Sequence, residues 1–164
     1  MQVGGGGFRE RAMTLQVALW LSLLALLTAL TLYESLHDRL PDGVLSVACI
    51  GYATALLLFA ATPEQLVHGF AAGGAGFALG LIGAPLAAPA GRRLLCGRAP
   101  LCVGLVVGWP GIVVVGAAWG FLASVVAFYF LVTNRGRELL QISFLPFLTL
   151  SAIVFFVMRA TIFR

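Results

Sequence analysis

Charged side chains are scarce in this sequence: they make up 10% of its 164 residues, whereas 61% of the residues are hydrophobic. A water-soluble domain carries charge on roughly a quarter of its residues, so six acidic and ten basic side chains are too few to cover one. In lipid, only helices and closed barrels satisfy every backbone hydrogen bond. Long apolar runs without two-residue alternation exclude the barrel. The composition therefore predicts an all-α membrane protein.

Residues that usually mark metal, redox or phosphate chemistry are also few. Cys49 lies in an apolar run, while Cys96 and Cys102 flank an arginine-bearing stretch, and none forms a CxxC pair. We therefore expect free thiols packed as small apolar groups, with no zinc site and no disulfide framework. His37 and His68 fall on opposite sides of the predicted membrane, so no metal is expected. The sequence has no phosphate or dinucleotide fingerprint, which predicts no cofactor, and no block of basic charge, which argues against nucleic acid.

Long apolar runs predict about six membrane segments, because one crossing needs roughly 20 apolar residues. The expected segments are 14–33, 44–62, about 69–90, about 100–109, about 112–132 and about 142–158. The fourth is short or tilted, since Trp109-Pro110-Gly111 interrupts the uncharged run 101–133. Residues 1–13 are expected to be a disordered extension, 91–100 a loop, and 14–164 one transmembrane domain. Arginine counts favour the loops after the first, third and fifth segments in the cytoplasm.

Glycine is spaced for helix contact in the third segment. Gly73, Gly76, Gly80 and Gly83 follow one another at intervals of three, four and three residues, which puts them on one helix face. Small residues let helix backbones approach closely where lipid supplies no hydrophobic drive. The face predicts either packing within the chain or a groove for another helix. The four-residue spacing recurs at Gly104/Gly108 and Gly116/Gly120.

Three short stretches resemble the type IV prepilin peptidase family over about residues 14–160. In this family the first catalytic aspartate precedes an Arg-Ile-Pro-Asn/Asp sequence. Residues 39–42 here are similar to that sequence, and Glu34, six residues before Leu40, lies in the place of the aspartate. Gly97-Arg98-Ala99-Pro100 occupies the slot of the family's Gly-x-Gly-Asp. The stretch 142–147, Ile-Ser-Phe-Leu-Pro-Phe, is similar to the family's Ile-Pro-Phe-Gly-Pro-Phe. The resemblance implies a helical membrane scaffold of the bacterial cytoplasmic membrane.

The sequence differs from the family at the positions of the catalytic residues. The resemblance implies an aspartic peptidase dyad, in which two carboxylates share a proton. Glu34 keeps a carboxylate, but Pro100 has no titratable group and no backbone N–H. Beyond Asp42 the remaining carboxylates are Glu64 and Glu138, and a Glu34/Glu138 pair has no family precedent. We therefore expect no catalytic residues.

Three functions remain open. The preferred one is a non-catalytic relative of the prepilin peptidases, associated with a type IV pilus system, that binds or helps assemble a hydrophobic helix. The family's natural ligand, the apolar N-terminal helix of a pilin-like protein, suggests this role. The second is an active membrane aspartic-type peptidase with a substituted dyad. The third is an accessory subunit of a larger membrane complex, favoured by the near absence of extramembrane residues. The expected partners are the bilayer and another membrane protein.

Overall fold

The computed structural model describes residues 5–37, 42–60, 62–83, 93–133 and 145–162, and helices make up almost all of them. The described helices are α1 (Gly5–His37), α2 (Asp42–Phe59), α3 (Pro63–Gly83), α4 (Arg93–Val107), α5 (Gly111–Val132) and α7 (Leu145–Ile162). No strand occurs in these ranges. The predicted all-α bundle is confirmed.

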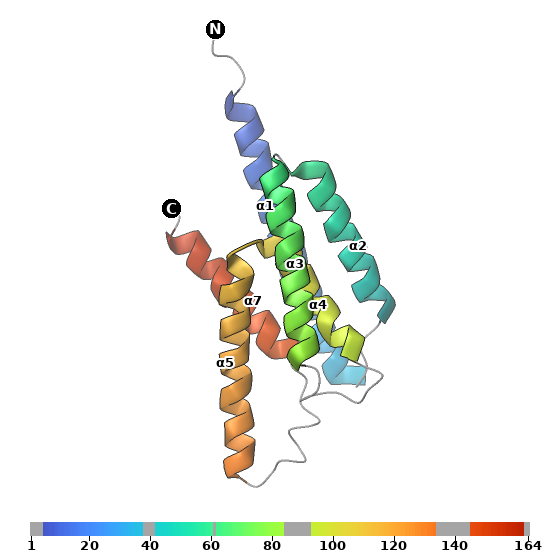
Figure 1. The fold of residues 1–164 in the computed structure, drawn as a ribbon, viewed down its shortest axis with the longest axis vertical. Coiled ribbons are helices and arrows are strands. Elements are labelled where there is room, and N and C mark those ends of the chain that lie inside the picture. The colour runs from blue at the N-terminus through green and yellow to red at the C-terminus, as the bar shows by residue number, and fades with distance from the viewer. Residues whose placement is uncertain (1–4, 38–41, 61, 84–92, 134–144, 163–164) are drawn as a thin grey trace.

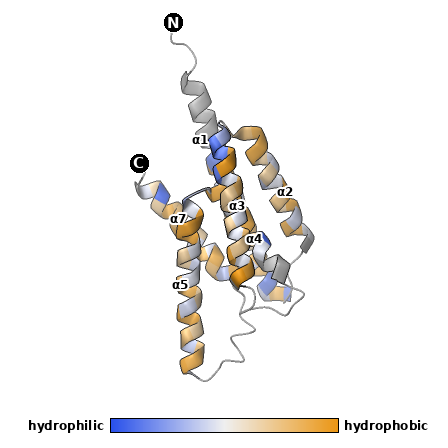
Figure 2. Cartoon of the chain, in the orientation of Figure 1, coloured by the Kyte–Doolittle hydropathy of each residue, from blue (hydrophilic) through white to orange (hydrophobic). Residues whose placement is uncertain are grey.

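Three of the described helices are long and apolar enough to cross a membrane: the stretch Gln16–His37 of α1, the stretch Pro63–Ile82 of α3, and Gly111–Val132, which is α5. Shorter apolar stretches lie in α2, α4 and α7. Many large apolar side chains point outward, such as Val47 at 71% exposure and Phe121 at 69%, and Figure 2 shows hydrophobic residues along α2 and α5. Because water would penalise so much exposed apolar surface, the surrounding solvent is lipid. The chain is a helical membrane protein.

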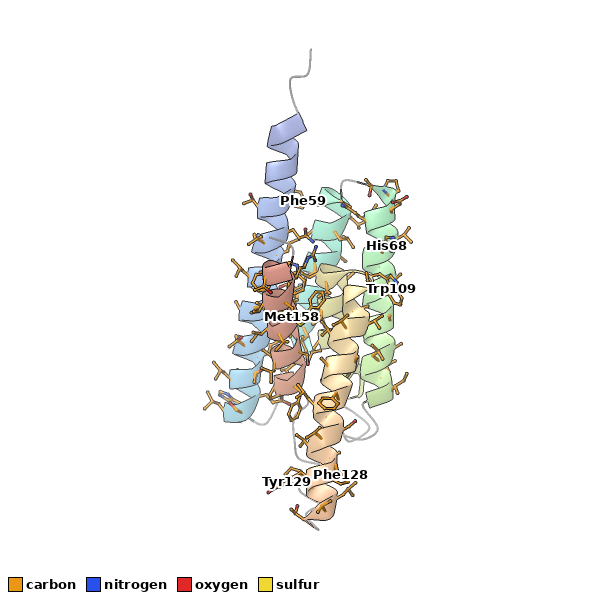
Figure 3. All side chains as sticks on the ribbon, turned by 90° about the vertical axis from the view of Figure 1, so that its left-hand side faces the viewer. Phe59, His68, Trp109, Phe128, Tyr129 and Met158 are labelled. Atoms are coloured by element: carbon orange, nitrogen blue, oxygen red, sulfur yellow. The ribbon has the colours of Figure 1, made fainter. Side chains whose placement is uncertain are left out.

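Successive helices alternate in direction (Figure 1). Helices α1, α3 and α5 run one way and α2, α4 and α7 the other, so the first and last helices place both termini at the same end of the bundle. Helix α4 lies in the centre and contacts each of the other five described helices. Its residues Ala99, Cys102 and Val103 are buried accordingly. Figure 3 shows that α5 extends past its neighbours, with Phe128 and Tyr129 at the projecting end.

Helices α1 and α7 are joined by aromatic stacking and by one polar pair. Trp20, 2% exposed, stacks on Phe155 with 5.8 Å between ring centroids and lies 5.6 Å from the ring of Phe156. Toward the other end, the hydroxyl oxygens of Thr31 and Thr149 are 3.1 Å apart. Such inter-helix hydrogen bonds hold membrane helices together where burial of apolar surface gains nothing.

Two boundaries differ from the sequence expectation. Residues 91–100 were expected as a loop, but α4 begins at Arg93 and continues through Pro100. Backbone groups in lipid must bond within the helix, and neighbouring helices let a membrane helix tolerate the one bond that a proline removes. Helix α1 begins at Gly5, inside the stretch 1–13 expected to be disordered.

The interruption between α4 and α5 lies where the sequence predicts it. Gly108, at φ 72°, ends α4, and the Trp109–Pro110 peptide bond is cis. A positive φ is readily reached only by residues such as glycine. The N–H of Ile112 donates to the carbonyl of Gly108 at 3.0 Å, and α5 starts at Gly111. The fourth helix is accordingly short, with 15 residues.

Candidate functional site

Glu34 and Pro100, the residues in the family's dyad positions, lie in different helices. Glu34 is partly buried in the last turn of α1, which ends where α4 begins (Figure 1). Pro100 is buried midway along α4, and its carbonyl carbon lies 2.8 Å from the point that a Cβ on Gly76 would occupy. Proline can neither give nor take a proton at its side chain. These two positions therefore supply one carboxylate, whereas acid–base hydrolysis by an aspartic dyad needs two.

Two other carboxylates, Glu64 and Glu138, were considered from the sequence as partners of Glu34. Glu64 is exposed in the first turn of α3, which begins at the opposite end of the bundle from Glu34 (Figure 1). Glu138, the remaining candidate, lies outside the described residues, and so does any Glu34/Glu138 pair.

The two histidines are separated along the bundle. The ring of His37, at the end of α1, stacks on Tyr33 with 4.4 Å between centroids. His68 is exposed near the start of α3, toward the other end (Figure 3). Within the described ranges, no three His, Cys, Asp or Glu side chains are grouped to hold a metal ion.

The glycine face of α3 lies against α4 of the same chain. A Cβ on Gly73 would come within 3.0 Å of the Leu105 side chain, and a Cβ on Gly104 would lie 2.8 Å from the Cα of Gly73. Gly76 faces the carbonyl of Pro100, and Gly80 is buried on the same side. Gly83 is the last residue of α3, and its surroundings lie outside the described part. Because α4 already covers this face, a partner helix has no access to Gly73 or Gly76.

A polar and thiol cluster joins α2 to α4. The guanidinium of Arg98 donates to the hydroxyl of Ser46 at 2.9 Å. One turn further along both helices, the sulfur atoms of Cys49 and Cys102 are 3.0 Å apart, and the Cys49 thiol donates to the Arg98 carbonyl at 3.5 Å. Both cysteines are free thiols. Arginine inside an apolar helix is costly unless it is paired, so this cluster fixes how α4 sits on α2.

Sequence reasoning missed this cluster because it assigned Arg98 to a loop. With α4 starting at Arg93, Arg98 and Cys102 are four residues apart on one helix face, and Ser46 and Cys49 are three apart on α2. Matching three- and four-residue spacings on two helices were the available signal. The sequence does not say that α2 and α4 are neighbours, so the pairing could not be read from it.

One side of the outer part of α5 is exposed within the described residues. Its buried residues are Gly111, Ile112 and Val115, all in its first two turns. Beyond them, Phe121 and Phe128 are each 69% exposed. These apolar side chains face lipid or another membrane protein.

Comparison of the chain with protein-family models, curated protein sequences and solved structures found no match. The fold therefore defines a class, the helical membrane proteins, and the resemblance to prepilin peptidases stays a prediction.

Proposed function

We propose that this chain is a multi-pass protein of the bacterial cytoplasmic membrane that binds or helps assemble a hydrophobic helix without cutting it. One observation carries the proposal: α5 offers an apolar face of small residues, and its part at Gly120 and Ser124 is exposed. The absence of a carboxylate at Pro100 supports the non-catalytic part, since Glu34 alone cannot act as both acid and base. The prepilin-peptidase-like motifs suggest the kind of ligand, the apolar N-terminal helix of a pilin-like protein.

The face consists of small residues at four-residue spacing. Gly116, Gly120 and Ser124 follow one another along α5. Gly116 packs near Leu79 of α3, but a Cβ on Gly120 would meet no atom within 4 Å. The Ser124 hydroxyl donates to the Gly120 carbonyl at 2.7 Å, so it can enter an apolar interface without leaving its proton unpaired. The face thus begins inside the bundle at Gly116 and becomes exposed at Gly120 and Ser124.

The same chemistry already makes a helix contact in this molecule. Gly73, Gly76 and Gly104 bring the backbones of α3 and α4 together, because van der Waals packing of close backbones replaces the missing hydrophobic drive in lipid. The open continuation at Gly120 fits a second helix in the same way. A bulky side chain at Gly120 should exclude a partner helix while leaving the bundle intact, because nothing in the described chain touches that position.

Site-specific crosslinking tests this proposal. A photoreactive amino acid at Ser124 should crosslink to a single-span or pilin-like membrane protein in the native membrane, and the same group at Ile50, exposed on α2 at 67%, should not. Gly120→Leu should abolish the crosslink from Ser124. Gly74→Leu is the matched control, since Gly74 also has no atom within 4 Å of its Cβ but lies on α3, and it should preserve the crosslink.

The outcomes separate the alternatives. Lipid adducts alone at Ser124, or a crosslink that survives Gly120→Leu, would contradict the helix-binding proposal. Crosslinks to several subunits of one assembly would favour an accessory subunit. Cleavage of a prepilin-like substrate that is lost in Glu34→Gln would instead favour an active peptidase.

A further inference from the structure

The two thiols of the α2–α4 cluster are held in register by their neighbours. Ser46 and Cys49 lie one turn apart on α2, and Arg98 and Cys102 lie one turn apart on α4. The two helices run in the same direction (Figure 1). The Arg98–Ser46 hydrogen bond, at 2.9 Å, therefore sets the register that brings the Cys49 and Cys102 sulfurs to 3.0 Å. A disulfide needs the sulfurs at about 2.0 Å, so the two sulfur atoms, now 3.0 Å apart, have to approach by about 1 Å.

The two thiols differ in access. Cys102 is 0% exposed in the core, whereas Cys49 is only partly buried. Ile50, which follows Cys49 in α2, is 67% exposed. The approach to Cys49 thus passes along apolar surface, so a reagent arrives from the lipid phase and meets Cys49 before Cys102.

We propose that Cys49 and Cys102 are a redox pair that a lipid-soluble hydroperoxide oxidises to a disulfide, stapling α2 to the central helix α4. Cys49 sulfur attacks the terminal oxygen of the hydroperoxide, the O–O bond breaks, and the alcohol leaves with the thiol proton. Cys49 is then a sulfenic acid. Cys102 sulfur attacks the Cys49 sulfur, the S–S bond forms, and the hydroxyl leaves as water with the proton of Cys102. Two thiols thereby give two electrons, and one hydroperoxide becomes one alcohol and one water.

The test uses the full chain in lipid bilayers with Cys96→Ser, which removes the third thiol. Cumene hydroperoxide should abolish both remaining thiols together, lower the intact mass by about 2 Da and add no oxygen. The oxidised protein should unfold at a higher temperature, and a reductant should return both the mass and the unfolding temperature. With Cys102→Ser added, Cys49 should instead gain about 16 Da as a sulfenic acid. If Cys96→Ser impairs folding, the wild-type chain serves, and its thiol count should fall from three to one.

A displaced cysteine supplies the matched control. Cys49→Ala with Gly51→Cys moves the thiol by about 200° around α2, to a position with no atom within 4 Å. This variant should form no intramolecular disulfide with Cys102. Equal disulfide formation in both arrangements would show random encounter and overturn the proposal. The proposal would also be overturned if the intact pair gained oxygen atoms without losing about 2 Da, or if disulfides formed only between chains.

Discussion

Gly76→Ala should push α3 and α4 apart at the centre of the bundle. The added methyl carbon would lie 2.8 Å from the carbonyl carbon of Pro100 and closer still to its oxygen, whereas ordinary contacts begin at 3.4 Å. The neighbour is main chain inside a helix, so it cannot rotate away as a side chain would. The two helices must therefore separate by at least 0.6 Å at this point.

The expected cost follows from that displacement. Overpacking a well-fitted interface costs about 1–3 kcal/mol, while exchanging a helical glycine for alanine stabilises by about 0.5–1 kcal/mol. The net expectation is a loss of up to about 2.5 kcal/mol for Gly76→Ala. Gly74→Ala, two residues away on the lipid-facing side, keeps the stabilisation that alanine gives a helix, and its methyl group would meet no atom within 4 Å. It should leave the protein as stable as the wild type, or more so.

Unfolding in mixed micelles of a mild detergent and increasing dodecyl sulfate, followed by circular dichroism, measures both variants under one condition. The expected order of midpoints is Gly74→Ala at or above the wild type and Gly76→Ala below it, with about 1–3 kcal/mol between the two variants. Because both changes are glycine to alanine in the same helix, the intrinsic helix preference cancels. Equal midpoints would refute the inference that α3 and α4 are in backbone contact at Gly76.

Two further predictions concern the contact between α1 and α7. Trp20→Ala should lower the free energy of unfolding by about 3–5 kcal/mol, because it removes a buried ring from an aromatic stack. Trp109→Ala, at a site that is 50% exposed, should change the free energy of unfolding little. Similar losses from both variants would argue against the stack. The hydroxyl pair of Thr31 and Thr149 should show a coupling of about 0.6 kcal/mol, and at most roughly 1.7, in a double-mutant cycle with valine. Strict additivity of the two single variants would show that the hydroxyls do not interact.

Most of the fold follows from composition and apolar run length. The scarcity of charge identifies lipid as the solvent. The six expected segments overlap the six described helices in order, and three of these helices are long and apolar enough to cross a membrane. The break near Trp109-Pro110-Gly111 was visible because two full crossings do not fit into 33 uncharged residues. These inferences succeed because a bilayer imposes a fixed length and complete backbone bonding on each helix.

The rest of the fold depends on which helices contact one another, and the lengths of the apolar runs do not encode these contacts. Arg98 looked like a loop residue because charge and proline usually mark the end of a membrane segment. In the structure, the Ser46 hydroxyl accepts a hydrogen bond from its guanidinium, and the helix continues. Likewise, the Gly73 and Gly76 face was consistent with both an internal and an external helix. Only the position of α4 distinguishes the two, because Gly104 supplies the complementary small residue.

The two proposed sites are physically separate, so each can fail alone. Helix α4 carries Cys102 and contacts every other described helix, but the buried part of α5 ends at Val115. Stapling α4 to α2 therefore stiffens the bundle without reaching Gly120, which has no atom within 4 Å of an added Cβ, or Ser124, which is exposed. Capture of a helix at Ser124 should proceed equally with Cys49 and Cys102 oxidised or reduced. A crosslink that disappears on oxidation would mean that α5 moves with α4, and that the open face belongs to the bundle rather than to a partner.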